Sequence, residues 1–158
     1  MNKKGFTLIE LLIVIAIIAI IAGVVFVALD PLTRFQDSRD SRRWGDVTGI
    51  LSAVKINQVD LKGAYLDSIV TTTEDLYYII GTDTSGCNSG CTAVSSTQSA
   101  CVDLTELVTD GYLASVPMDP NGGTADKTMY YLNKNSNGTL TVGACLPEHT
   151  PAGISVAR

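Results

Sequence analysis

The chain has a single histidine among its 158 residues, and this scarcity limits the chemistry open to it. His149 has no second histidine beside it, and the sequence contains no Gly-rich phosphate loop, metalloprotease helix or nucleophile elbow. Catalytic sites usually combine several such groups. The sequence therefore predicts a protein that is not an enzyme, has no catalytic residues and needs no cofactor.

Basic residues are also scarce. Eleven Lys and Arg stand against 16 Asp and Glu, which gives a formal net charge of −5. A general nucleic-acid binder needs a basic face to neutralise phosphates. The composition therefore argues against nucleic acid as the partner of the chain.

One long segment has no charge at all. From Leu11 to Leu29 every residue is apolar or glycine. As a helix, residues 6–29 would extend about 36 Å, which exceeds the roughly 30 Å of a bilayer's hydrocarbon core. We therefore predict a transmembrane helix over 6–29. Glu10 is the only carboxylate in it, and a charge at that depth needs a partner, so Glu10 is the first functional candidate.

Three interpretations of this N-terminal segment were open. A secretory signal peptide would have a shorter apolar region and a cleavage site after it, and a plain signal anchor would not explain Glu10. The third rests on residues 5–10, Gly-Phe-Thr-Leu-Ile-Glu, which resemble the processing motif of type IV pilins and of type II secretion pseudopilins. Lys3 and Lys4 precede the apolar run and predict a cytoplasmic N-terminus, with the C-terminal part outside.

The resemblance implies a set of roles for these residues. Residues 1–5 would be a leader that prepilin peptidase removes after Gly5, Phe6 would be the N-methylated mature N-terminus, and Glu10 would guide assembly. The partners would be other copies of the chain in a helical homopolymer, the inner-membrane pilus assembly machinery, and the membrane before assembly. The expected function is that of a structural prepilin, closest to a type IVa-like major pilin, for an extracellular pilus-like filament. A pseudopilin of a type II secretion system and a minor pilin with an adhesive or DNA-uptake role remain alternatives.

A second helical segment follows the apolar run. Asp30-Pro31 predicts a kink, which gives Pro31 a part in assembly, and Gly63 predicts the end of the helix. Residues 30–62 are expected to form an amphipathic continuation, because apolar residues recur at helical spacing at Val47, Ile50, Leu51, Val54 and Leu61. Four arginines interleaved with aspartates are expected to pair with neighbouring subunits or lipid headgroups, or to be solvated: Arg34, Arg39, Arg42 and Arg43.

Residues 63–158 predict a small globular head. Strands are expected at 76–80, 128–132 and 139–144, with a turn at Asn137-Gly138. A short helix is expected to begin at Asp103, capped by Asp103 and Glu106. An antiparallel sheet packed on the long helix gives an α+β fold, the pilin fold.

All four cysteines lie in the head, which indicates an oxidising compartment. Three pairings are possible, and we favour Cys87 with Cys91 and Cys101 with Cys145. Zinc is the weaker interpretation, because the spacing is not that of a zinc site.

Two further motifs concern the loops of the head. The segment from Gly111 to Pro120 resembles one common in major pseudopilins and related pilins, although Asn121 stands where pseudopilins often have an aromatic residue. Oxygen donors follow at Asp119, Asn121 and Asp126 as weak calcium candidates, although a plain turn is the favoured interpretation. The Asn137-Gly138-Thr139 sequon is interpreted as a hairpin turn, not as a sugar acceptor.

Overall fold

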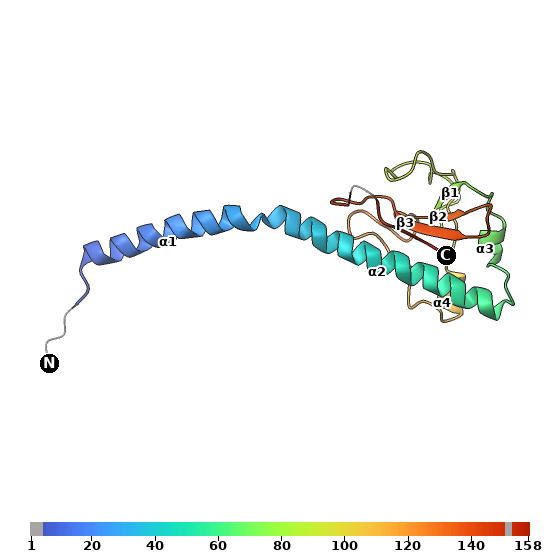
Figure 1. The fold of residues 1–158 in the computed structure, drawn as a ribbon, viewed down its shortest axis with the longest axis horizontal. Coiled ribbons are helices and arrows are strands. Elements are labelled where there is room, and N and C mark those ends of the chain that lie inside the picture. Colours follow the sequence, from blue (N-terminus) through green and yellow to red (C-terminus); the bar gives the residue numbers. More distant parts are fainter. Residues whose placement is uncertain (1–4, 151–152) are drawn as a thin grey trace. The chain divides into compact units, whose positions relative to one another are not determined.

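The computed structural model describes residues 5–150 and 153–158, so Lys3, Lys4 and the rest of the leader before Gly5 lie outside the described residues. The chain divides into two compact units, Met1–Phe35 and Gln36–Arg158, and each is described by itself (Figure 1). We call residues 36–158 the head unit.

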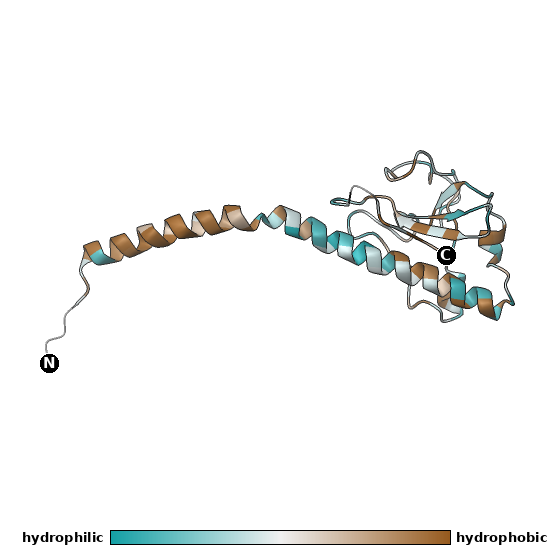
Figure 2. Ribbon diagram, in the orientation of Figure 1, coloured by the Kyte–Doolittle hydropathy of each residue, from teal (hydrophilic) through white to brown (hydrophobic). Residues whose placement is uncertain are grey.

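Apart from Glu10, helix α1, Leu8–Leu29, is apolar on every side (Figure 2), and it has no buried residue. It is long and apolar enough to cross a membrane. It ends at Asp30, which has a left-handed backbone (φ 37°), and Pro31 begins helix α2. Aspartate tolerates this conformation better than most residues, and proline suits the first position of a helix. The predicted interruption at Asp30-Pro31 is therefore confirmed.

Helix α2, Pro31–Asp60, buries one face in the head unit. The predicted apolar positions Val47, Ile50, Leu51 and Val54 are at most 1% exposed, which confirms the helical spacing. Leu61 was predicted wrongly, since it follows the helix and is 44% exposed. Beyond the helix, Gly63 has a φ of 101° and its N–H donates to the Gln58 carbonyl at 2.8 Å, a C-terminal cap that favours glycine.

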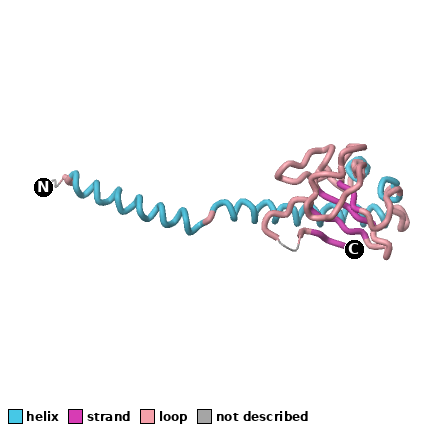
Figure 3. The backbone as a smooth tube through the Cα atoms, turned by 90° about the horizontal axis from the view of Figure 1, so that it is seen from above, coloured by secondary structure: helices cyan, strands magenta, loops and turns pink. Residues whose placement is uncertain are grey.

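The sheet has four antiparallel strands in the order β1-β2-β3-β4. Figure 3 shows the strands in magenta within the head unit. They are β1 Tyr77–Ile79, β2 Tyr130–Lys134, β3 Leu140–Ala144 and β4 Ser155–Ala157. The first three confirm the predicted strands and the small antiparallel sheet, and with them the α+β pilin fold. Strand β4 was not predicted; it adds to β3, with Val142 opposite Val156.

The sheet separates two apolar clusters, because side chains alternate along a strand. Tyr130, Leu132 and Val142 pack with the buried face of α2. Tyr131 belongs to the second cluster, which holds the disulfide-bonded loop. Its ring lies so close to Gly143 on β3 that a β-carbon there would approach within 2.4 Å of it. The layers of the head unit are thus α2, the sheet and the disulfide loop.

Two one-turn helices complete the head unit. Helix α3, Asp67–Val70, was not predicted. Helix α4, Glu106–Thr109, begins later than predicted, and Thr105 takes the N-cap position without a side-chain bond. The predicted cap at Asp103 was wrong, because its Oδ1 accepts from the Thr105 N–H at 2.8 Å and forms a turn before the helix.

The disulfides correct the predicted pairing. Cys87 is bonded to Cys101 and Cys91 to Cys145, with Cα–Cα distances of 5.4 and 4.4 Å. The loop folds back on itself, so that the Cys87 N–H donates to the Ser99 carbonyl. The tip of the loop instead reaches the end of β3, where the N–H groups of Thr92 and Ala93 donate to the Cys145 carbonyl. The predicted pairing of Cys87 with Cys91 was therefore wrong, because the fold of the loop, and not short separation in sequence, determines the partner of Cys87.

Candidate assembly site

The N-terminal motif forms a closed set of hydrogen bonds at the start of α1. The Thr7 Oγ1 accepts from the Glu10 N–H at 3.3 Å, and Glu10 Oε2 accepts from the Thr7 N–H at 2.8 Å and from the Thr7 hydroxyl at 2.7 Å. This is a capping box, which satisfies N–H groups that a helix start leaves free. Phe6 precedes it and is 87% exposed.

The capping box gives Glu10 a partner that the sequence analysis missed. We considered a partner for Glu10 only in a neighbouring subunit, yet Thr7 already binds its Oε2 within the chain. The signal was available, because Thr followed three residues later by Glu is the sequence signature of a capping box. Both bonds go to Oε2, so among the described residues no donor reaches Oε1.

The α1 surface carries a shallow apolar groove beside Gly23. Its lining residues are Ala19, Ile20, Gly23, Val24, Val27 and Ala28. A β-carbon on Gly23 would meet no atom of the described residues within 4 Å, so none of them fills this place. In an apolar medium, small residues allow another helix to approach closely.

In the head unit, Arg43 of α2 is completely buried and holds three carboxylates. Its Nε and Nη2 donate to the two oxygens of Asp119 at 2.7 and 2.9 Å. Nη1 donates to Asp40 at 2.7 Å, and Nη2 also reaches Glu148 at 3.2 Å. Burial would lower the pKa of Arg43, but these bonds raise it on balance, so the guanidinium stays charged.

The loop that follows β3 is fastened to the same part of α2. The N–H groups of Glu148 and His149 donate to Asp40 at 3.1 and 2.8 Å, and the Thr150 hydroxyl reaches it at 3.3 Å. Arg39 binds both oxygens of Glu148. We call Arg39, Asp40, Arg43, Asp119 and Glu148 the buried charge cluster; Arg39 and Glu148 at its edge are partly exposed. The cluster joins α2 to two loops that lie far from it in the sequence, the loop that contains Asp119 and the loop that follows β3.

The cluster sets the protonation of its acids. The Arg39 hydrogen bond, followed by those from Arg43, lowers the pKa of Glu148. Burial would raise the pKa of Asp40, but hydrogen bonds from the His149 N–H, Arg43 and the Glu148 N–H lower it on balance. Arg39 and Arg43 were expected to face other subunits, lipid or water. For these two the prediction was wrong, because both pair within the chain.

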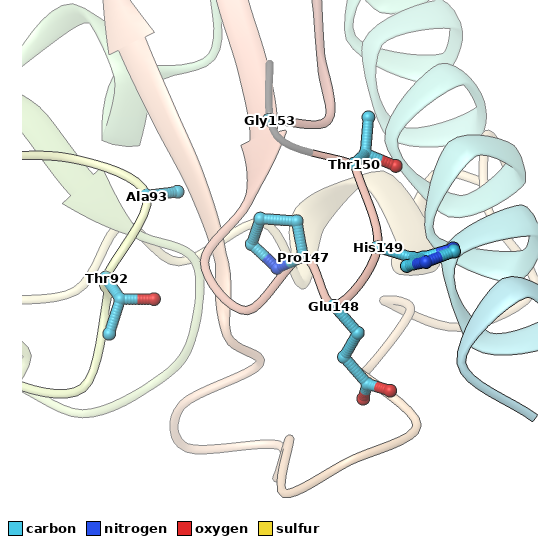
Figure 4. Close-up of a pocket in the computed structure, with 7 residues that line it drawn as sticks. All are labelled: Thr92, Ala93, Pro147, Glu148, His149, Thr150 and Gly153. Carbon is cyan, nitrogen blue, oxygen red and sulfur yellow. The ribbon is translucent and has the colours of Figure 1, made fainter. Parts of the chain in front are cut away.

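A hollow of about 570 Å³ lies between the loop at Thr92 and the loop that follows β3 (Figure 4). Its other lining residues are Ala93, Pro147, Glu148, His149, Thr150 and Gly153. Its two titratable side chains are already paired with α2: Glu148 with Arg39, and His149 Nδ1 with Asp37 Oδ1 at 2.8 Å. Both pairs hold the loop that follows β3 against α2.

The three calcium candidates do not converge on one point. Asp119 is paired with Arg43, and Asn121 Nδ2 donates to Glu148 at 3.3 Å. Asp126 Oδ1 instead accepts from the Thr82 hydroxyl at 3.0 Å. Among the described residues, no group of three or more His, Cys, Asp or Glu is placed to hold a metal ion. Asp119 is therefore a partner of Arg43 in this structure, not a member of an assembled calcium site.

Comparison with known proteins adds to these observations. Residues 1–26 match the family described as the prokaryotic N-terminal methylation motif. No curated protein and no solved structure gives a significant match.

The match identifies a class III signal peptide at the start of the chain, the N-terminal motif of the type IV pilin and pseudopilin family. Together with the α+β pilin fold, it supports a type IV pilin-like or pseudopilin precursor, a structural protein and not an enzyme. The motif implies processing by prepilin peptidase and assembly into pilus-like polymers.

Proposed function

We propose that the chain is the precursor of a filament subunit, cleaved after Gly5, N-methylated at Phe6 and polymerised into a type IV pilus-like surface filament. The match of residues 1–26 to the methylation motif carries this proposal. Helix α1 supports it, because a helix that is apolar on every side needs apolar surroundings. The bilayer provides them before assembly, and the packed α1 helices of other copies provide them in the filament.

The orientation follows from charge and disulfides. Lys3 and Lys4 would remain on the cytoplasmic side, so the head unit would lie outside. The two disulfides of the head unit fit such a compartment.

Cleavage changes the charge at the start of α1. It removes Lys3 and Lys4 and leaves an amine on Phe6, whose positive charge methylation retains. Before assembly, the Thr7 capping box satisfies Oε2 of Glu10 and helps the helix to tolerate a carboxylate in the membrane. In the filament, the free Oε1 would bind the Phe6 amine of a neighbouring subunit. A buried charge left without its partner is destabilising, so this pair selects one register between subunits. The contact is head-to-tail and does not close, so it propagates as a fibre.

Glu10→Ala tests the assembly step separately from processing. We expect the variant to be cleaved, as N-terminal mass spectrometry would show, but to give far fewer filaments in electron micrographs of sheared cells. Thr7→Val is the matched control, because it removes the hydroxyl bonds to Glu10 and keeps the carboxylate, so filaments should still form. Normal filament yield from Glu10→Ala would refute the pairing.

Gly5→Glu tests the processing step. A bulky charge at the cleavage position should block removal of the leader, so the protein should stay in the membrane at precursor mass. Gly5→Ala is the matched control, because it adds only a methyl group. A mature Phe6 N-terminus on the Gly5→Glu protein would contradict the assigned cleavage position.

A pseudopilin of a type II secretion system is the second candidate, favoured by the segment from Pro117 to Pro120 and disfavoured by the four cysteines. The two candidates differ in phenotype. Loss of extended surface fibres on deletion of the gene supports the pilin, whereas loss of protein secretion with no change in fibres supports the pseudopilin.

A further inference from the structure

The hairpin between β2 and β3 carries a sequon that the filament function does not use. Asn137-Gly138-Thr139 is the pattern at which asparagine accepts an N-linked glycan. Asn137 and Gly138 are exposed at the tip of the hairpin, and Thr139 is half-buried. The sequence predicts only a hairpin turn at these residues.

The turn accounts for only part of this motif. The Gly138 N–H donates to the Asn135 carbonyl at 2.9 Å, and Gly138 has a φ of 84°, which favours glycine. Gly138 is therefore explained by the hairpin geometry, a tight turn followed by a left-handed residue. The turn also uses the Thr139 hydroxyl, which accepts from the Asn135 amide nitrogen at 2.8 Å. Among the described residues, the turn makes no use of the amide nitrogen of Asn137.

The hydroxyl is directed at the amide of Asn137. Thr139 Oγ1 donates to Asn137 Oδ1 at 2.7 Å, and the Thr139 N–H donates to the same oxygen at 3.0 Å. Two donors on Oδ1 stabilise the negative charge that develops on the amide when Nδ2 gives up a proton. Among the described residues, Nδ2 itself donates to no acceptor, so it is free to react.

The rest of the hairpin would tolerate a bulky substituent at this place. The Ser136 N–H donates to Asp75 Oδ1 at 3.0 Å. The Asn135 amide nitrogen donates to the hydroxyls of Thr139 and Thr141 at 2.8 and 2.9 Å. These bonds hold the turn without using Nδ2 of Asn137. A group added to that exposed nitrogen would extend into solvent and would displace no core side chain.

We propose that Asn137 is the acceptor of an N-linked glycan, transferred outside the cytoplasm from a lipid-linked oligosaccharide diphosphate. Nδ2 forms the bond to C1 of the first sugar, and the bond from that carbon to the diphosphate oxygen breaks. Nδ2 loses one proton, which passes to a carboxylate base of the transferring enzyme. The lipid diphosphate leaves, and no oxidant or reductant is required. The proposal rests on the proposed orientation, with the head unit outside.

The test is mass spectrometry of the full chain isolated from its native cells. Reduction and trypsin release residues 135–158 as one peptide. We expect this peptide to carry the mass of a glycan, localised to Asn137 by fragmentation that preserves the sugar. An unmodified peptide, a peptide with only a deamidated Asn137, or a sugar on Ser or Thr would overturn the proposal.

Two matched pairs of variants sharpen the result. Asn137→Asp keeps an oxygen for both Thr139 donors but should lose the glycan completely, whereas Asn121→Gln, at another exposed Asn-Gly pair, should keep it. Thr139→Ser should keep the glycan and Thr139→Val should lose it. Retention in Asn137→Asp or Thr139→Val would refute the assignment. Filament formation is measured separately from glycosylation. Filaments built of unglycosylated subunits would refute only the glycan at Asn137. Glycosylated protein that forms no filaments would refute only the proposed function.

Discussion

Arg43→Met removes the centre of the buried charge cluster. The Arg43 side chain is 0% exposed and donates four hydrogen bonds to three carboxylates. Methionine is apolar and of similar length, so packing changes little, but Asp119, also 0% exposed, loses its charged partner. Its Oδ1 keeps only the bond from the Asn121 N–H at 2.8 Å. Leaving one buried charge without its partner costs about 3–5 kcal/mol. We therefore expect the free energy of unfolding to fall by about that amount.

The assay is urea unfolding of the full chain in detergent with both disulfides intact, followed by the fluorescence of Trp44, the single tryptophan. With a slope near 2 kcal/mol/M, the midpoint should fall by about 2 M. Arg42→Met is the matched control, since its side chain is 63% exposed and lies 3.7 Å from Asp46. It should cost less than about 1 kcal/mol.

A double variant separates lost bonds from an orphaned charge. Arg43→Met with Asp119→Leu should recover part of the loss, because no unpaired Asp119 carboxylate remains. Equal midpoints for Arg43→Met and Arg42→Met would refute the account of the cluster. A double variant no more stable than Arg43→Met would refute the role assigned to Asp119.

Three further predictions concern the head unit. The pKa of Glu148 is lowered in the folded state, so its contribution to the free energy of unfolding is present above its unfolded pKa and is lost as pH falls through the folded value. The difference in unfolding free energy between the unmodified chain and Glu148→Gln should therefore shrink from pH 7 to below about pH 3. A constant difference would contradict this. Cys91→Ser with Cys145→Ser opens the longer disulfide loop, of sequence separation 54, and should lower the unfolding free energy by about 4 kcal/mol in denaturant titrations. Replacing Cys87 and Cys101, of separation 14, should lower it by about 3 kcal/mol. The reverse order would contradict the loop-length reasoning. Gly143→Val would bring a β-carbon to 2.4 Å from the Tyr131 ring and should lower the unfolding free energy by about 1–3 kcal/mol. Gly49→Val, at an exposed glycine of α2 whose β-carbon would meet nothing within 4 Å, should cost less, and equal losses in a thermal melt would contradict the close approach.

Local patterns predicted most of the fold. The buried positions of α2 followed from apolar spacing, and the break before it followed from Asp30-Pro31, because both depend on residues close in sequence. Strand β4 was missed because its three residues are stabilised by pairing with β3 and have little apolar pattern of their own. The disulfides were mispaired because Cys91 meets Cys145 only through the fold of the loop.

The site was predictable in its motif and not in its contacts. Gly5, Phe6 and Glu10 stand out by their position before and within an uncharged run, and their roles in cleavage, methylation and assembly remain predictions. Arg43 looked like one of several exposed arginines, because nothing local distinguishes it from Arg42. Its burial depends on Asp119 and Glu148, which lie 76 and 105 residues away in sequence. Such long-range pairing cannot be read from spacing along one helix.

The N-terminus of the mature protein tests the central claim most directly. Filaments or membranes from the native cells would be digested with trypsin, which should release residues 6–34 as the first peptide. We predict that this peptide begins at Phe6 and carries a methyl group on its amine. A peptide that retains Gly5 or earlier residues, or an unmethylated Phe6, would contradict the claim.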